Sequence, residues 1–211
     1  MSIKIGLISD THSTVSPLKE ALSIFQREQV DMIICAGDIA GYGEDELTQT
    51  IDLLVQHNCK MIAGNHDQLT DDMASSDQLK KIKDFFNSLP ETLEMNIEGK
   101  RIYVVHAHPP DSQHGGIKLL DPQGQVYADR KTYWEQQLKN FNYDVLIVGH
   151  THQVFAEQIG NTLVINPGST QFNHTCMVLS LPDMSVETFA LSNKQPVKTW
   201  NWGIFYKEQN L

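Results

Sequence analysis

Five apolar runs end on residues of the types that bind metal ions, and this recurrence constrains the fold more than any other feature. One of them, Ile33 to Ala36, stops at Gly37 and Asp38. Apolar runs of this length between loop signals are typical of buried strands in a parallel sheet, which binds ligands at the C-terminal ends of its strands. A single Gly-Asp is more often a plain turn, but five such ends can meet at one place. The residues at the five ends are Asp10 and His12, then Asp38, then Asn65, His66 and Asp67, then His106, and last His150 and His152.

Length and composition are those of an ordinary globular protein. With 211 residues, 40% of them hydrophobic and 20% charged, the chain predicts one domain over residues 1–192 and an aromatic extension over 193–211. The formal charge of −10 argues against a nucleic-acid duplex as partner. Without an apolar leader or a membrane-length apolar stretch, we expect a cytoplasmic protein with no membrane contact. The three cysteines are too far apart in sequence for a zinc knuckle and are expected to be reduced.

The periodicity of the apolar residues alternates between strand and helix. Ser16 is a candidate N-cap with Pro17 in the first turn, and helical spacing recurs from about residue 45, over 71–89 and over 130–140. Residues 93–105 read as a hairpin, and residues 154–191 as a meander of strands. The pattern predicts an α/β protein in which two mixed sheets pack face to face with helices outside. This is a four-layer α-β-β-α sandwich with the metal site at the C-terminal ends of the strands.

Two segments have no place in this scheme. Residues 107–129 are long and rich in turn signals, which indicates a loop on the substrate side. The extension carries Trp200, Trp202, Phe205 and Tyr206, which either pack on the domain or form an interface with another subunit. A homo-oligomer is therefore an open alternative.

The chemical types of the candidate ligands indicate which metal ions the site would bind. Aspartate, neutral histidine and the asparagine oxygen together suit Mn²⁺, Fe, Zn²⁺ or Ni²⁺, whereas calcium prefers oxygen alone and Mg²⁺ tolerates fewer imidazoles. Asp38 has two carboxylate oxygens and can bridge two cations, which places it at the centre of the predicted site.

Taken together, the motifs resemble those of the calcineurin-like metallophosphoesterase superfamily. The two glycines that flank Tyr42 and the Asn-Pro-Gly-Ser turn at 166–169 are similar to the small single-domain bacterial and archaeal phosphoesterases of that superfamily. The likeness spans about residues 3 to 190. The motifs are Asp10-x-His12, Gly37-Asp38, Gly64-Asn65-His66-Asp67, His106 and Gly149-His150-x-His152.

The resemblance implies two divalent metal ions, with Mn favoured and Fe, Zn, Ni or Mg as alternatives. Asp10, His12, Asp38 and His152 would hold one ion, and Asp38, Asn65, His106 and His150 the other. A water between the ions, with its pKa lowered, would give the hydroxide that attacks phosphorus. His66 would protonate the leaving group as the catalytic acid, with Asp67 orienting it.

Departures from the family pattern narrow the range of possible substrates. The arginine by which the protein-phosphatase branch grips phosphoproteins is missing after Asp38, so we discount protein dephosphorylation. The arginine that close relatives carry near Asn173 is also missing, so the grip on phosphate comes from elsewhere. His108 is either a support for a metal ligand or a structural histidine. His57, His114 and His174 are expected on the surface or in loops.

The leading hypothesis is an enzyme, a dinuclear metallophosphoesterase with phosphodiesterase activity that hydrolyses small phosphodiesters or nucleotide-like phosphate esters. The alternatives are a dinucleoside polyphosphate hydrolase and a non-catalytic scaffold on the same fold. Such scaffolds lose metal ligands or the acid histidine, whereas this chain has them all.

Overall fold

Strands from both halves of the chain build two separate sheets in the computed structural model, which describes residues 2–41, 46–68 and 77–200. The first sheet contains β1 (Ile3–Ile8), β2 (Met32–Cys35), β3 (Lys60–Met61), β9 (Thr175–Leu181) and β10 (Ser185–Ala190). The second contains β4 (Thr92–Ile97), β5 (Lys100–Val105), β6 (Val145–Ile147), β7 (Val154–Ile159) and β8 (Thr162–Pro167). Their strand orders are β10-β9-β1-β2-β3 and β4-β5-β6-β8-β7.

Each sheet combines parallel and antiparallel pairs. Strand β1 pairs in parallel with β2, which pairs in parallel with β3, whereas β9 is antiparallel to both of its neighbours, β1 and β10. In the second sheet β5, β6 and β8 are parallel, and β4 and β7 are the antiparallel edges. The parallel strands of one sheet therefore all end at the same edge of that sheet.

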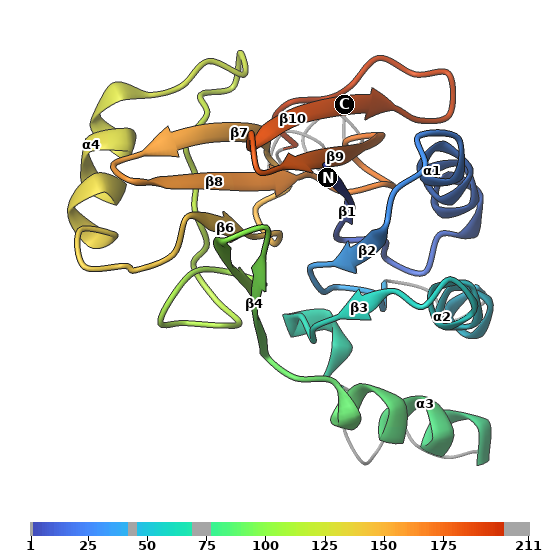
Figure 1. Ribbon diagram of the computed structural model, residues 1–211. Helices are drawn as coiled ribbons and strands as arrows, with labels where there is room; N and C mark the ends of the chain where they lie inside the picture. Colours follow the sequence, from blue (N-terminus) through green and yellow to red (C-terminus); the bar gives the residue numbers. More distant parts are fainter. Residues whose placement is uncertain (1, 42–45, 69–76, 201–211) are drawn as a thin grey trace, which may run out of the picture.

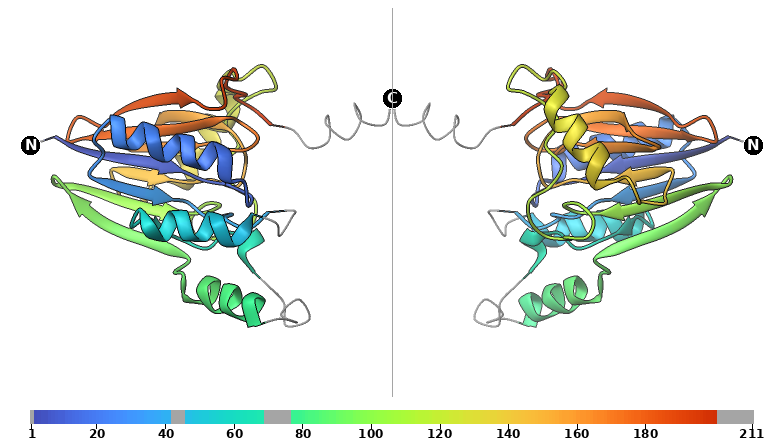
Figure 2. Two further views of the ribbon diagram at one scale, coloured as in Figure 1. Left: turned by 90° about the vertical axis from the view of Figure 1, so that its right-hand side faces the viewer. Right: turned by 90° about the vertical axis from the view of Figure 1, so that its left-hand side faces the viewer.

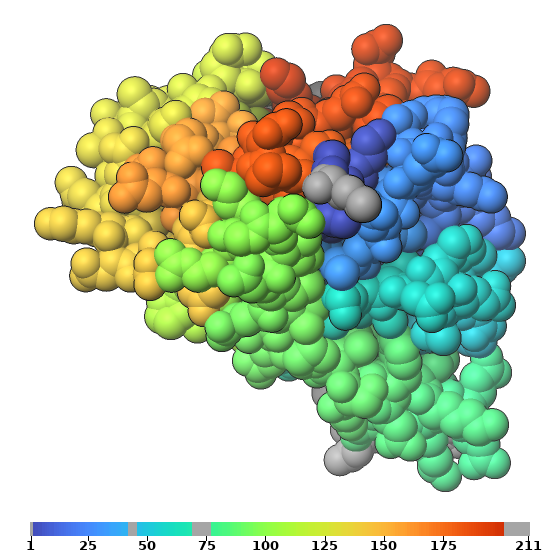
Figure 3. Space-filling view, in the orientation of Figure 1, coloured from blue at the N-terminus to red at the C-terminus, as the bar shows by residue number. Residues whose placement is uncertain are grey.

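Helices cover the outer faces of both sheets (Figures 1 and 2). Their bounds are α1 (Val15–Arg27), α2 (Leu47–Gln56), α3 (Asp77–Ser88) and α4 (Ala128–Gln137). Helices α1 and α2 lie against the first sheet, and α4 lies on the far side against the second. Helix α3 lies at the lower edge of the molecule, below α2 (Figures 1 and 3). This arrangement confirms the predicted four-layer sandwich.

The alternation of side chains along each strand separates the core into layers. Ile5 and Leu7 of β1 are fully buried between the two sheets, where they join Ile102 and Val104 of β5. Ile8 points the other way, into the cluster under α1 and α2. The apolar run that looked uniform in the sequence therefore serves two cores, which is why it carries no polar face.

The first helix begins earlier than its capping signal predicts. Ser16 was expected as the N-cap, but α1 starts at Val15, and Thr14 occupies the N-cap position without a capping hydrogen bond from its side chain. The backbone N–H of Val15 instead donates to Oε2 of Glu46, 2.8 Å away. A carboxylate from another part of the chain thus replaces the local cap, a contact that no local pattern reveals.

The other expected elements are present with shifted bounds. Strand β3 is shorter than the run that predicts it, and α4 lies about two residues earlier than expected. Of the helix expected over 71–89, residues 77–88 form α3, and the part before residue 77 lies outside the described residues. Among the described helices, none has the length and hydrophobicity needed to cross a membrane.

The described part of the extension runs along the domain. The backbone N–H of Val154 donates to the carbonyl of Lys198, 2.9 Å away, and that of Trp200 donates to the carbonyl of His152, 3.1 Å away. Trp202, Phe205 and Tyr206 lie outside the described residues, so the domain boundary at residue 192 and the role of these rings stay predictions.

The three cysteines are expected to be unreactive in the folded protein. Cys35, Cys59 and Cys176 are free and buried, and burial raises the pKa of Cys59 and of Cys176 to about 12. Because only the thiolate reacts, labelling by a disulfide reagent at pH 8 should be on the order of 1,000-fold slower in the native than in the unfolded chain. Raising the pH from 8 to 9 should accelerate labelling of the native chain about tenfold and that of the unfolded chain only about threefold, because a thiol well below its pKa gains the full tenfold in thiolate. Rapid native labelling, followed by absorbance, would contradict this prediction.

Candidate metal centre

The candidate ligands come from both sheets and meet at the edge where the parallel strands end. Asp10, Asp38 and Asn65 follow β1, β2 and β3 of the first sheet, whereas His106 and His150 follow β5 and β6 of the second. Direct hydrogen bonds join the two halves. Oδ1 of Asp10 accepts the backbone N–H of His150 at 3.1 Å, and Nδ1 of His106 lies 2.7 Å from the carbonyl oxygen of Ala36. The site is thus built at the junction of the sheets.

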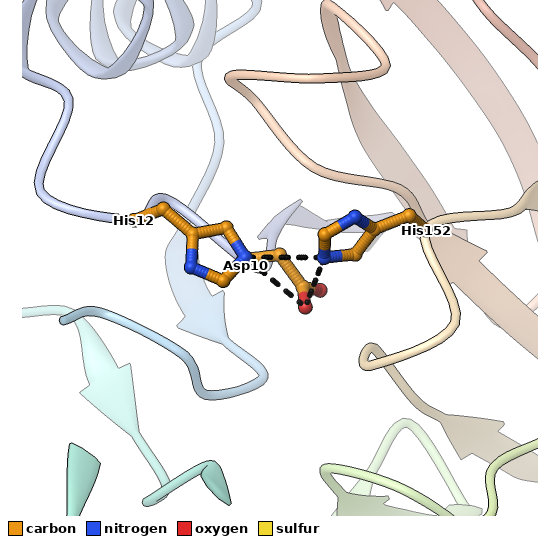
Figure 4. A group of neighbouring side chains, drawn as sticks. All are labelled: Asp10, His12 and His152. Atoms are coloured by element: carbon orange, nitrogen blue, oxygen red, sulfur yellow. Dashed lines mark hydrogen bonds and ion pairs between the residues drawn. The ribbon is translucent and has the colours of Figure 1, made fainter. Parts of the chain in front are cut away.

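Asp10, His12 and His152 form one potential metal-binding group, and all three are buried. Figure 4 shows the two imidazoles approaching from opposite sides with the carboxylate between them. Nε2 of His152 is 3.2 Å from Oδ1 of Asp10, and Nε2 of His12 is 3.1 Å from Nε2 of His152. Three ligand atoms therefore face one point, as a single cation requires.

A second group combines Asp38 with His106 and His150. Nε2 of His106 is 3.2 Å from Oδ2 of Asp38. The side-chain oxygen of Asn65 lies 3.2 Å from Nε2 of His106 and 2.8 Å from Nδ1 of His150. The structure therefore brings Asn65 into the same cluster, with a carboxylate, an amide oxygen and two imidazoles around one space.

Asp38 also belongs to a third group, with His12 and His66. The backbone N–H of His66 donates to Oδ1 of Asp38 at 2.9 Å, and the rings of His12 and His66 lie edge to face with centroids 5.1 Å apart. Asp38 and His12 thus connect the Asp10 group with the His106 group.

Two of the imidazoles are oriented by backbone carbonyls. Nδ1 of His106 lies 2.7 Å from the carbonyl of Ala36, and Nδ1 of His12 lies 3.2 Å from that of Ala40. Because a carbonyl only accepts, each Nδ1 carries a proton, and Nε2 is the atom that faces the centre and binds a metal when the imidazole is neutral. These donors fit divalent ions of the Mn²⁺ to Zn²⁺ type.

The backbone is strained at the candidate ligands. Five of them, none a glycine, have left-handed backbone dihedrals. The φ angles are 52° at Asp10, 46° at His12, 52° at Asp38, 64° at His150 and 47° at His152. Such a conformation costs about 1 kcal/mol or more at each non-glycine residue, and it concentrates at functional sites. Backbone bonds from Asp10 to Gly37 and from His12 to Asp38 hold this geometry.

Two glycines allow the loops to approach the carboxylates closely. A Cβ on Gly64 would overlap the carboxylate and the backbone nitrogen of Asp38, and one on Gly149 would lie 2.7 Å from Oδ2 of Asp10. The glycines that precede Asn65 and His150 are therefore needed for space at the carboxylates.

Burial and mutual charge set the protonation of the group. Burial would raise the pKa of Asp10, but His152 holds it well below its usual range. Burial lowers the pKa of His12 and of His150 to about 4, so both are neutral and able to bind a metal at pH 7. Burial also opposes the charge on His106, but its hydrogen bond to Asp38 raises its pKa to about 9. A cation bound here would replace that proton.

Asp67 lies beside the centre and binds backbone. Its carboxylate accepts the N–H of Ala40 at 2.7 Å and the N–H of Gly64 at 2.8 Å, so it joins the Asp38 loop to the Asn65 loop. Burial and the charge of Asp38 raise its pKa to about 7. These contacts favour a positioning role for Asp67 between the two loops. That Asp67 orients the His66 ring stays a prediction.

Several contributors were not identified from the sequence. Ser169 donates its hydroxyl to the carbonyl of Asp10 at 2.6 Å, and Asn166 donates its side-chain N–H to the carbonyl of Gly149 at 2.9 Å. The ring of Phe172 stacks on His152 with centroids 5.3 Å apart, and Trp200 stacks on Phe172 at 5.2 Å. The Asn-Pro-Gly-Ser turn was a usable signal for the two polar residues. Phe172 had no comparable signal, and Trp200 was named only as one ring of the aromatic extension.

His108 contacts a different part of the structure from the metal cluster. Its Nδ1 lies 3.0 Å from the carbonyl of Pro109, and its ring packs edge to face on Trp134 at 5.3 Å. These contacts favour the structural reading over support of a ligand. His57 and His114 are exposed, and His174 is partly buried near Lys194.

Residues 3–183 match the model of the calcineurin-like phosphoesterase superfamily domain. The chain belongs to this superfamily. An uncharacterized protein of Methanocaldococcus jannaschii is 31% identical over 182 residues, which cover 78% of the chain and 68% of that protein. A phosphodiesterase of the same archaeon is 27% identical over 168 residues, covering 79% and 83%. A hypothetical protein from Pyrococcus horikoshii OT3 shares the fold, with a TM-score of 0.73 at 17% identity over 99% of the chain and 92% of that structure.

Membership confirms the resemblance deduced from the motifs. The chain is a calcineurin-like metallophosphoesterase, a hydrolase that acts on phosphoric ester bonds, and its relatives come from archaea and bacteria. The superfamily depends on metal ions, and the His and Asp groups described above can hold them. The identity of the metal and the cytoplasmic location stay predictions.

Proposed function

We propose that the protein is a dinuclear phosphodiesterase that hydrolyses small phosphodiesters or nucleotide-like phosphate esters. The observation that carries the proposal is the position of Asp38, which shares one potential metal-binding group with His106 and His150 and another with His12. On this proposal, Asp10, His12, Asp38 and His152 hold one divalent ion, and Asp38, Asn65, His106 and His150 hold the second. Mn²⁺ is the metal we favour.

Divalent ions bound there would neutralise the phosphoryl oxygens and lower the pKa of the attacking water. The residues of the chain supply the rest. Asp10 and Asp38 remain ionised because neighbouring histidines hold their pKa values down, so the site attracts cations at neutral pH. His66 is half-buried at the edge of the centre, from where it can give a proton to the leaving oxygen. Hydrolysis adds the water oxygen to phosphorus and breaks the bond to the leaving oxygen, which takes that proton.

Metal binding is expected to stabilise the fold strongly, because the ligands come from both sheets. Adding MnCl2 at about 100 times its Kd to chelated protein should raise Tm by roughly 5–10 °C, given about 2.7 kcal/mol of linkage for a domain of this size. Differential scanning calorimetry measures the shift, with CaCl2 as the comparison ion. Equal shifts with both ions would contradict a site of mixed nitrogen and oxygen ligands.

The function is tested by turnover. Chelated protein reconstituted with Mn²⁺ is given bis-p-nitrophenyl phosphate and p-nitrophenyl phosphate side by side. Faster metal-dependent release of p-nitrophenol from the diester supports the proposal. Protein that binds two ions and releases none from either probe would overturn it and favour the non-catalytic scaffold.

A further inference from the structure

The loop over residues 107–127 is fastened to the segment that carries the metal ligands. The hydroxyl of Thr151 donates to the carbonyl of Ile117 at 3.0 Å, and Oε1 of Gln153 accepts the backbone N–H of Leu119 at 2.8 Å. Ile117 and Leu119 are fully buried, whereas Lys118 between them is exposed. The backbone of Lys118 is therefore fixed on both sides, and its side chain is directed outward beside the metal centre.

Arg130 is held in place next to the same loop. Its Nη1 donates to the carbonyl of Leu120 at 2.7 Å, and its guanidinium carbon lies 5.2 Å from the ring centroid of Tyr127. These contacts occupy one face and one N–H of the guanidinium. The remaining donors form a planar fork, which suits a phosphoryl group.

Lys118 and Arg130 line two adjoining cavities. The first, of about 370 Å³, is also lined by His150, His152 and Trp200, so it opens directly on the metal centre. The second, of about 480 Å³, is lined by the same two cations together with Tyr133 and Trp134. The cations therefore lie between the metal centre and an aromatic cavity.

The two cavities lack the negative charge that the molecule carries as a whole. The chain has a formal charge of −10, yet among the described residues that line the two cavities none is acidic. Asp121 is close in sequence, but its Oδ1 accepts the backbone N–H groups of Gln123 and Gln125, each at 2.9 Å. Its charge is thus directed into its own turn, and Lys118 and Arg130 remain available for an anion.

We propose that Lys118 and Arg130 bind a second phosphoryl group next to the scissile one, and that the substrates are nucleoside polyphosphates. Tyr133, which is 54% exposed, offers an aromatic face in the outer cavity for the nucleobase. This inference rests on the proposed function, and it supplies a phosphate grip in place of the arginine missing near Asn173. Hydrolysis adds a water oxygen to the phosphorus at the metal centre, breaks the bond to the bridging oxygen and gives that oxygen a proton. The remaining phosphoryl groups stay at the two cations.

Binding is measured first, because it does not require turnover. Isothermal titration calorimetry with adenosine 5′-(β,γ-methylene)triphosphate compares wild type with Lys118→Gln, Arg130→Gln and the double variant. We expect about tenfold weaker binding for each single variant and roughly 100-fold for the double variant, as charge-assisted hydrogen bonds are lost. Lys139→Gln is the matched control, since Lys139 is an exposed cation near the end of α4. Unchanged affinity in the double variant would overturn the proposal.

Turnover then separates this proposal from the proposed function. With Mn²⁺ present, the double variant should lose roughly 100-fold in kcat/KM for diadenosine tetraphosphate and far less for bis-p-nitrophenyl phosphate, which has no second phosphoryl group. Equal losses on both probes would overturn the role assigned to the two cations. If wild type hydrolyses neither probe, the proposed function fails, while the calorimetric comparison still decides whether the cations bind polyphosphate.

Discussion

Asp38→Asn is expected to abolish metal-dependent hydrolysis of bis-p-nitrophenyl phosphate, with a loss of 1,000-fold or more, on the order of what removal of a key electrostatic group costs. Asp38 is 2% exposed, and its carboxylate contacts Nε2 of His106 and the backbone N–H of His66. Asparagine keeps the shape and one oxygen but removes the charge that two cations would share. The variant should therefore fold and bind fewer ions than wild type.

Metal content and rate are measured together for this variant. Inductively coupled plasma mass spectrometry counts the ions per chain, and circular dichroism confirms the fold. Asp52→Asn is the matched control, because Asp52 is an exposed aspartate on α2. An Asp38→Asn protein with two bound ions and an unchanged rate would refute the bridging role.

His66→Ala is expected to slow hydrolysis by about 10²- to 10⁴-fold when the leaving group is an alkoxide, the usual contribution of a general acid. The loss should be small for bis-p-nitrophenyl phosphate, because p-nitrophenolate leaves without protonation. The comparison substrate is a 2′,3′-cyclic nucleotide, whose leaving group is a ribose hydroxyl.

The same variant distinguishes an acid from a ligand. His66 shares a potential metal-binding group with His12 and Asp38, so its imidazole can also be read as a ligand. If His66 acts as an acid, the His66→Ala variant should bind as many metal ions as wild type. If His66 is a metal ligand, the variant should bind fewer. His57→Ala is the control, since His57 is exposed and its Nδ1 contacts the carbonyl of Leu53 at 2.8 Å. Equal losses on both substrates, with fewer ions bound, would reject the acid role.

The architecture and the candidate ligands could be predicted from the order of apolar runs and polar residues along the chain. Buried strands such as β1 and β2 have uniform apolar runs, and their side chains serve a core on each face. The change from helical to alternating period located the β4–β5 hairpin. Because parallel strands end at one edge, residues that follow those strands, such as Asp10 and Asp38, can be expected to meet.

Features that depend on contacts between distant segments could not be predicted in this way. Glu46 caps α1, Ser169 holds the carbonyl of Asp10, and Phe172 stacks on His152. None of these pairs is close in sequence, so no local period or spacing encodes them. In the sequence, nothing distinguishes Lys118 and Arg130 from other loop and helix cations. The fold places both between the metal centre and the aromatic cavity. Local sequence pattern predicts where the strands end, and so where the candidate metal ligands lie. Substrate contacts come from loops, whose shape depends on long-range packing.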